Sequence, residues 1–248
     1  MSKLSQNNSF SWNGDAVACD SGIIWGIAEQ VNGLMAILVN TPGGVLTGTQ
    51  LKALAEIVGE DGVMKISRRM SPILLIPKEK VETAISCLES AGLRIANLHK
   101  SVRNIVACPG KGFSSNSRGD TLELAAALDK EFYGTLLPWD LKIAIAGCPR
   151  NCAGITCQDI GLMAEPRSRF SLWLGGTETG MNPRHGALVK KGIPRTQVPA
   201  VIRKILEIYC EKAKQYEPEF DYKVRLYNII EKTGLNPFLQ GIDDVLAI

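Results

Sequence analysis

The N-terminal part of the chain alternates between two patterns of apolar residues. Apolar runs typical of strands occur at residues 34–39, 63–67, 73–76 and 93–98. Two segments between these runs repeat apolar residues three and four positions apart, as helices do; they carry Leu51, Leu54, Ala55 and Val58, and then Val81, Ile85 and Leu88. Thr49 is the expected cap of the first helix, and Gly92 is the expected stop of the second. The predicted order is strand, helix, strand, strand, helix, strand.

This order predicts a ferredoxin-like arrangement, in which an antiparallel sheet carries both helices on one face. We place this half-domain at residues 33–100, after an N-terminal extension at residues 1–32.

Residues 101–248 have a different character, because turns that contain cysteine separate their apolar runs. Strands are predicted at 105–107, 141–146, 160–164 and 170–174, and helices at 121–132, 199–214 and 222–232. Asp120 or Thr121 is the expected cap of the first of these helices. The predicted fold class is therefore α+β, with a ferredoxin-like half-domain followed by a mixed α/β half-domain.

Composition restricts the classes of function. Of the 248 residues, 45% are hydrophobic and 21% are charged, as in water-soluble globular proteins. The net charge of +3 is too small to indicate a surface for nucleic acid or membranes. The apolar run at 34–39 is far shorter than the roughly 20 residues that span a bilayer, and residues 1–10 lack the apolar core of a signal peptide. We expect a cytoplasmic protein that binds neither nucleic acid nor membranes. The net charge is still compatible with a local site for an anion.

Four of the seven cysteines lie close together in the sequence, at Cys108, Cys148, Cys152 and Cys157. Cys148 and Cys152 follow a predicted strand directly, so both thiolates can face one metal centre. A zinc site would need a second Cys or His pair, and His99 and His185 are far apart. A role as small core residues would not explain two Cys-Pro dipeptides at strand ends. The pattern favours iron and sulfur.

Three stretches resemble the siroheme-containing sulfite and nitrite reductases. They are residues 102–110 (VRNIVACPG), 142–154 (KIAIAGCPRNCAG) and 159–161 (DIG). The region from 43 to 93 is similar to the ferredoxin-like half-domain of that family, including Ser67 and Arg68 where the family has a Thr-Thr-Arg-Gln motif. The resemblance extends from about residue 33 to 235 and implies a siroheme- and iron–sulfur-binding half-domain at 101–248.

The resemblance implies a [4Fe–4S] cluster held by a C-x5-C pair and a later C-x3-C pair, whose last sulfur also touches the siroheme iron. Cys108, Cys148 and Cys152 match, with Cys152 as the bridging residue. The remaining position is Ser114, whose oxygen is a harder ligand than a thiolate. Cys157 could replace it, because five residues of chain can span at most roughly 17 Å. Cys157 is therefore the expected fourth ligand, and weak ligation by Ser114 or an iron without a fourth protein ligand are the alternatives.

The resemblance also implies a basic cavity for siroheme and an anionic substrate. Arg68, Arg103 and Lys142 match basic residues of the family, so all three are expected to act in catalysis and the two arginines also to bind siroheme. Asp140 stands where the family has a second lysine, which reverses the sign of that charge.

Five more residues are expected to contact the cofactors. Gly175 and Gly176 allow close approach of the backbone to a propionate-rich cofactor edge, and Arg184 is a nearby cation. Lys111 and Arg150 flank the cysteines, where positive charge raises the reduction potential of a cluster.

The resemblance therefore implies a siroheme- and [4Fe–4S]-dependent reductase of sulfite, or of nitrite, in which electrons pass from the cluster to the siroheme. An electron donor such as ferredoxin is expected, because the sequence has no nucleotide-binding fingerprint. Larger members of the family resemble two copies of the half-domain pair, so we expect this single copy to form a homodimer. Ser114 and Asp140 favour a different function, that of a non-catalytic iron–sulfur or tetrapyrrole-binding electron-transfer protein on the same scaffold.

Overall fold

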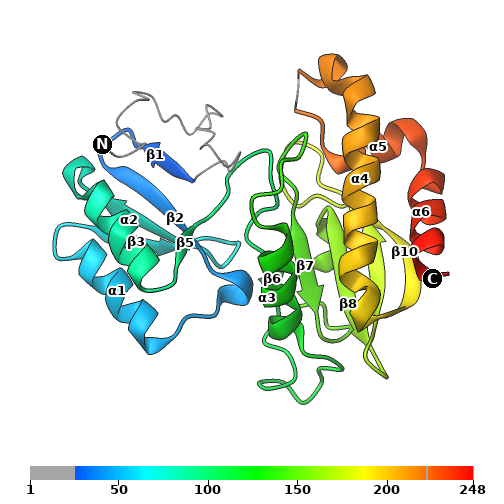
Figure 1. The fold of residues 1–248 in the computed structure, drawn as a ribbon, viewed down its shortest axis with the longest axis horizontal. Coiled ribbons are helices and arrows are strands. Elements are labelled where there is room, and N and C mark those ends of the chain that lie inside the picture. Colours follow the sequence, from blue (N-terminus) through cyan, green and yellow to red (C-terminus); the bar gives the residue numbers. More distant parts are fainter. Residues whose placement is uncertain (1–25, 222, 248) are drawn as a thin grey trace.

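The computed structural model describes residues 26–221 and 223–247, which form two halves that lie side by side (Figure 1). Each half contains one sheet with its own apolar core. The predicted extension lies outside the described residues up to position 25, and its last part supplies a short strand to the first sheet.

The first half has the predicted order of elements. They are β1 (Ile27–Glu29), β2 (Met35–Asn40), α1 (Gly48–Val58), β3 (Val63–Ile66), β4 (Pro72–Ile76), α2 (Val81–Ser90) and β5 (Arg94–Ile95). The sheet runs β3-β4-β2, and β1 and β5 share the other edge of β2; every pairing is antiparallel. Leu54 of α1 and Leu88 of α2 enter the same core as Ile37 and Leu74. The ferredoxin-like arrangement is therefore present.

The cap of α1 differs from the prediction. The side chain of Thr47, not Thr49, accepts a hydrogen bond from the Gln50 N–H, while the Gln50 side chain accepts one from the Thr47 N–H. This reciprocal pair is a capping box, which begins the helix earlier than the apolar repeat indicated.

The second half is a mixed sheet with helices. Its elements are β6 (Val106–Ala107), α3 (Thr121–Phe132), β7 (Ile143–Ala146), β8 (Ile160–Glu165), β9 (Arg169–Leu174), β10 (Ala187–Pro194), α4 (Val198–Tyr216), α5 (Leu226–Thr233) and α6 (Asn236–Leu246). The strand order is β10-β9-β8-β7-β6, with parallel pairing from β6 to β8 and antiparallel pairing from β8 to β10. The predicted fold class agrees with this architecture.

Three of the described elements, β1, β10 and α6, were not expected from the sequence. β10 is an edge strand whose residues are exposed or half-buried except for Ile193, so it lacks the clear alternation of buried and exposed residues that marks a strand. α6 buries only Phe238, Gly241 and Ile242 along its length, which is a sparse apolar signal.

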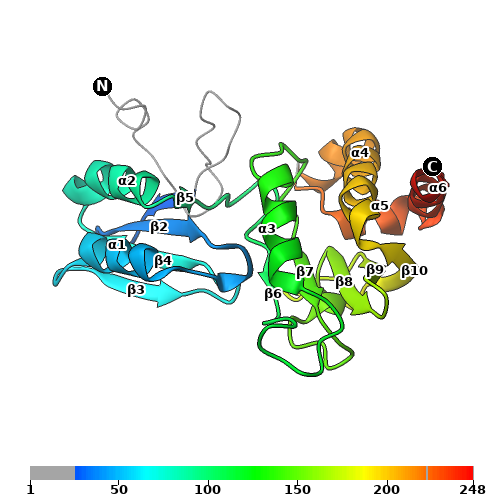
Figure 2. The same ribbon diagram turned by 60° about the horizontal axis from the view of Figure 1, so that its bottom comes forward.

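The two faces of the second sheet differ in side-chain size. Ile143 and Ile145 point into the large core shared with α3 and α4, whereas Ala144 and Ala146 point to the opposite face. Figure 2 shows α4 and α6 on one side of this sheet and the loop that follows β6 on the other. Because Ala144 and Ala146 are small, they leave space on this face of the sheet for the loops that carry the cysteines.

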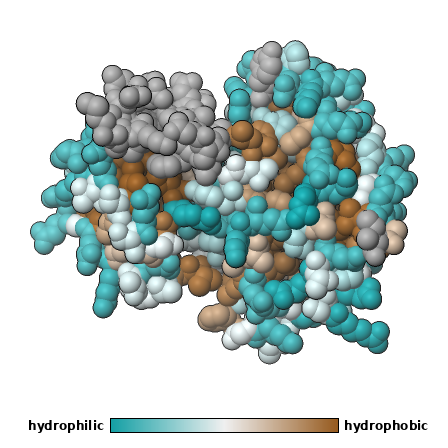
Figure 3. Space-filling model, viewed as in Figure 1, coloured by the Kyte–Doolittle hydropathy of each residue, from teal (hydrophilic) through white to brown (hydrophobic). Residues whose placement is uncertain are grey.

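A buried polar cluster joins the two halves. Asn40 of β2 donates to both carboxylate oxygens of Asp129 on α3, at 2.9 and 3.0 Å, and Arg94 also pairs with Asp129. The Arg94 guanidinium lies 3.9 Å from the centre of the Tyr133 ring, whose hydroxyl donates to the Ile95 carbonyl. We call Asn40, Arg94 and Asp129 the junction cluster. Figure 3 shows a largely hydrophilic surface with apolar patches, some of them beside this junction.

Among the described helices, none is long and apolar enough to cross a membrane.

Candidate functional site

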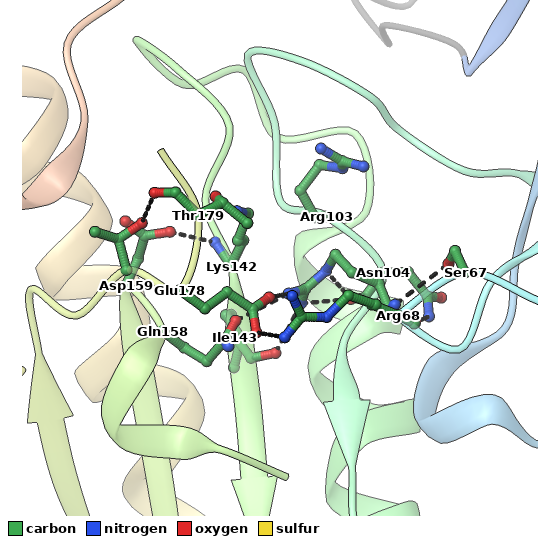
Figure 4. A network of polar contacts seen from close by, with 12 residues as sticks. Ser67, Arg68, Arg103, Asn104, Lys142, Ile143, Gln158, Asp159, Glu178 and Thr179 are labelled. Atoms are coloured by element: carbon green, nitrogen blue, oxygen red, sulfur yellow. Dashed lines mark hydrogen bonds and ion pairs between the residues drawn. The ribbon is translucent and has the colours of Figure 1, made fainter. Parts of the chain in front are cut away.

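A cavity of about 260 Å³ lies between the two halves (Figure 4). The first half contributes the β3–β4 turn, the connection between the halves contributes residues after β5, and the second half contributes the start of β7 and the β9–β10 loop. The polar lining residues are Ser67, Arg68, Arg69, Ser71, Asn97, Arg103, Asn104, Lys142, Glu178 and Thr179. The three predicted catalytic residues, Arg68, Arg103 and Lys142, are among them.

Buried Lys142 and half-buried Arg103 place positive charge at the cavity. The Lys142 Nζ donates to the Thr179 Oγ1 at 2.8 Å, and burial, followed by the nearby Arg225, lowers the pKa of the Lys142 ammonium. The Arg103 guanidinium lies 3.6 Å from Asp140, and burial lowers the pKa of Arg103. Both cations are poorly hydrated and suited to an anion.

Arg68 and Arg69 are neighbours with different environments. The Arg68 side chain is 78% exposed and pairs with Glu178 at 3.3 Å. Arg69 is buried and donates to the carbonyls of Asn104 and Ile143 and to the Gln158 side chain. Burial lowers the pKa of Arg69 to about 10. The sequence analysis missed Arg69, because nothing in the sequence distinguishes it from Arg68.

Asp140 does not line the cavity, although it occupies the sequence position where the family has a lysine. Its carboxylate is buried between Arg103 at 3.6 Å and Arg225 at 3.8 Å. Arg225 immediately precedes α5, a helix remote in sequence, so no local pattern could have indicated this pairing. Two guanidinium groups thus neutralise the reversed charge.

A second buried carboxylate lies behind the cavity. Asp159 accepts hydrogen bonds from the Lys142 N–H at 2.9 Å and from Arg225 at 3.1 Å. Burial raises the pKa of Asp159 to about 6, and the Arg225 charge opposes this rise. Asp159 fixes the backbone of Lys142 at the start of β7.

Ser71 supplies an unused polar atom. Its residue is 2% exposed and lines the cavity, and its hydroxyl has no hydrogen-bond partner among the described residues. Buried hydroxyls are normally paired, so an unpaired one at a cavity wall fits a polar ligand. With four basic residues in the same lining, that ligand would be an anion.

The predicted cluster ligands lie on two adjacent loops. Cys108 follows β6, while Cys148 and Cys152 follow β7, and these strands are parallel neighbours whose carboxyl ends meet at one edge. The Gly147 N–H donates to the Cys108 sulfur at 3.0 Å, and the Arg118 N–H donates to the Gly147 carbonyl at 2.7 Å. The loops that carry the three cysteines are therefore neighbours at one edge of the sheet.

Cys157 lies in a different environment. Its sulfur is 3.6 Å from the His185 Nδ1, which is also 3.0 Å from the Thr156 hydroxyl. Within the described residues, no three His, Cys, Asp or Glu side chains converge on a point suitable for a single metal ion. The side chain of Cys157 is thus engaged with the β9–β10 loop.

The remaining predicted cofactor residues do not line the cavity. A side chain at Gly176 would come within 2.3 Å of the Thr156 carbonyl, so the close approach made there is to the chain's own backbone. Gly175 has a positive φ of 82° and lies against Ile230. Arg184 pairs with Glu231 and stacks on Tyr227, towards α5. Lys111 and Arg150 are exposed on the two cysteine-bearing loops.

Several curated proteins are similar to this chain in sequence. The assimilatory-type sulfite reductase of Nitratidesulfovibrio vulgaris is 26% identical over 84% of this chain and 91% of its own length. The NAD(P)H nitrite reductase of Emericella nidulans is 26% identical over 76% of this chain, and the cobalt-factor III methyltransferase of Priestia megaterium is 29% identical over 74%. The chain spans only 17% and 33% of the lengths of these two proteins.

Solved structures share the fold. The NirA protein of Mycobacterium tuberculosis superposes with a TM-score of 0.76 at 20% identity, over 90% of this chain and 45% of that chain. Dissimilatory sulfite reductase I superposes with a TM-score of 0.77 at 13% identity, over 93% of this chain and 76% of that chain.

The fold and several of the relatives are those of one class, the sulfite and nitrite reductases. Within this class, the model of the nitrite and sulphite reductase 4Fe-4S domain matches residues 99–248. The chain belongs to that family, and the resemblance seen in the sequence is confirmed.

Proposed function

We propose that this protein is a siroheme- and [4Fe–4S]-dependent reductase of sulfite, with nitrite as the next substrate. The observation that carries the proposal is the cavity where Arg68, Arg103 and Lys142 converge beside an unpaired buried hydroxyl. When bound, siroheme supplies an iron at which a sulfur or nitrogen oxyanion receives electrons.

The residues of the chain bind the anion and supply protons. Arg103 and Lys142 neutralise negative charge in a cavity where burial strengthens electrostatic interactions. The Nζ of Lys142 is also a proton donor, because its lowered pKa eases release of the proton. Arg69, on the β3–β4 turn of the first half, positions the site by donating to the carbonyls of Asn104 and Ile143 in the second half.

We propose that Cys108, Cys148 and Cys152 hold the [4Fe–4S] cluster, with Cys152 nearest the siroheme. Ser114 and Cys157 remain the candidates for the fourth ligand. The exposed charges of Lys111 and Arg150 lie on the same loops and would raise the reduction potential of the cluster. Electrons would come from a partner such as ferredoxin.

The second candidate function is electron transfer without reduction of a substrate. Ser114 supports this function, because it replaces a thiolate of the family pattern. Asp140 supports it less than the sequence suggested, because its carboxylate is paired with two arginines outside the cavity.

One set of measurements separates the two functions. Protein purified without oxygen is analysed for iron, sulfide and its absorption spectrum, and is then assayed for sulfite and nitrite reduction with reduced methyl viologen. Siroheme bands, a cluster absorbance and sulfite turnover are expected. A cluster without siroheme and without turnover would establish the electron-transfer function.

We also propose a homodimer. The edge strand β3 supports it, because Val63, Met64 and Ile66 are between 40% and 57% exposed beside unpaired backbone groups. Exposed apolar edge strands favour pairing with another chain.

A further inference from the structure

Glu178 places a carboxylate inside the basic cavity. Its carboxylate lies 3.3 Å from Arg68 and 4.0 Å from Arg69, and its side chain is 22% exposed (Figure 4). Of the described residues that line this cavity, Glu178 alone is acidic. A carboxylate of the chain itself therefore occupies the cavity in which the proposed function requires an anionic substrate to bind.

Glu178 belongs to a loop that is fixed at its base and exposed at its tip. Thr177 and Arg184 close the base through two backbone hydrogen bonds of 3.0 and 2.9 Å, and Thr177 is 2% exposed. At the tip, Gly180 has a positive φ of 97° and Met181 is 95% exposed. We call residues 177–184 the strap.

The next residue of the strap engages a second cation. The Thr179 hydroxyl accepts a hydrogen bond from the Lys142 Nζ at 2.8 Å. Glu178 and Thr179 together thus contact Arg68, Arg69 and Lys142, three of the four basic residues of the cavity.

The size of the cavity also indicates that the strap must move when a larger ligand binds. Its volume of about 260 Å³ is below the roughly 300–1,000 Å³ of typical ligand pockets. A ligand larger than a small oxyanion needs more room, and the tip of the strap is exposed, with Met181 95% accessible. Withdrawal of the strap would enlarge the cavity and, at the same time, would free Arg68 and Arg69 from Glu178.

We infer that Glu178 competes with the anionic ligand of this cavity for Arg68 and Arg69, and so determines how tightly the cavity binds an anion. This inference rests on the proposed function, which makes the cavity an anion site. When the ligand binds, it replaces the ion pairs of Glu178 with Arg68 and Arg69 by its own. The more stable the Glu178 ion pairs are, the lower is the affinity for the ligand. Glu178→Gln removes the competing charge and nearly preserves the shape of the side chain.

The test is isothermal titration calorimetry with inorganic sulfate, a sulfur oxyanion, on the full chain purified without oxygen. The dissociation constant should fall about tenfold or more in Glu178→Gln. The matched control is Glu131→Gln, which removes a carboxylate of similar exposure that is paired with Arg203 on the surface. This control should bind sulfate as the wild type does.

Hydrogen exchange with sulfate bound gives a second measurement, which reports release of the strap and not the affinity for sulfate. Sulfate should accelerate exchange at the amides of residues 180–182 in the wild type, because the strap is released from its contacts. Unchanged sulfate affinity in Glu178→Gln, or no sulfate binding in either protein, overturns the inference. Iron and tetrapyrrole analysis of the same samples tests the proposed function separately, so a loaded protein with unchanged affinity rejects only the role of Glu178.

Discussion

Buried charges at the cavity follow a common rule, namely that each has an opposite charge, a hydroxyl or a backbone carbonyl beside it. Arg69 is bonded to two carbonyls, while Asp140 and Asp159 share Arg225. Buried charges persist only when they are compensated in this way. Substitutions at these positions should therefore change the stability of the fold more than the reaction at the site.

Asp140→Lys tests the reversed charge. The substitution restores the lysine of the family, but here it would bury a third cation against Arg103 and Arg225. We expect a loss of about 3–5 kcal/mol in the free energy of unfolding and no gain in sulfite affinity. Urea denaturation and sulfite titration measure the two effects, with Asp140→Asn as the milder comparison. Tighter sulfite binding in a stable Asp140→Lys protein would contradict the observed orientation.

Asp159 should make stability depend on pH. Because the folded-state pKa of about 6 lies above the ordinary 3.8, the folded protein binds more protons than the unfolded chain between these values. The contribution of Asp159 to the free energy of unfolding therefore falls as pH rises from about 4 to about 6, by about 3 kcal/mol. Relative to Asp159→Asn, the wild type should lose stability across that window in urea denaturation.

Asp221→Asn, at a side chain that is 88% exposed, is the control substitution in the same denaturation series. A stability difference between the wild type and Asp159→Asn that stays constant from pH 4 to pH 6 would show that the Asp159 carboxylate is not perturbed.

Cysteine substitutions test the cluster ligands. Cys148→Ala should abolish bound iron and sulfide, because loss of one of three thiolates leaves too few ligands. Cys157→Ser should alter the cluster if that sulfur is the fourth ligand, and Ser114→Ala should then have little effect. Iron and sulfide analysis of anaerobically purified variants gives the ranking, with Cys210→Ala as the control. The opposite ranking would assign the fourth position to Ser114.

At the scale of elements, the junction cluster couples α3 to the first sheet. Asp129→Ala would leave Asn40, which is 6% exposed, without its carboxylate partner. We expect the free energy of unfolding to fall by about 2–3 kcal/mol, because an unpaired buried amide retains its desolvation cost. Chemical denaturation measures the change, and Lys130→Ala, at an exposed neighbouring position, should stay within about 0.5 kcal/mol of the wild type.

At the scale of the whole molecule, the chain contains one pair of half-domains with an exposed apolar edge at β3. We expect light scattering at micromolar concentration to give twice the mass of one chain. Ile66→Lys would place a charge on this edge and should shift the protein towards the monomer. Lys65→Ala, at the adjacent position, is the control. A monomer in the wild type would reject the homodimer.

The sequence by itself determined the element order of the first half after β1, the class of the second half and the family, and it predicted Cys108, Cys148 and Cys152 as cluster ligands. These features depend on local periodicity or on short motifs, which neighbouring residues encode. It also indicated Arg68, Arg103 and Lys142, which the structure brings to one cavity.

Only the tertiary structure decided which partners these residues have. Arg225 neutralises Asp140 from 85 positions further along the chain, and Glu178 meets Arg68 across a separation of 110. It also distinguished buried Arg69 from exposed Arg68, and it placed Arg184 beside α5 and Cys157 beside His185. Charge compensation and burial depend on distances in space, and no local pattern encodes those distances.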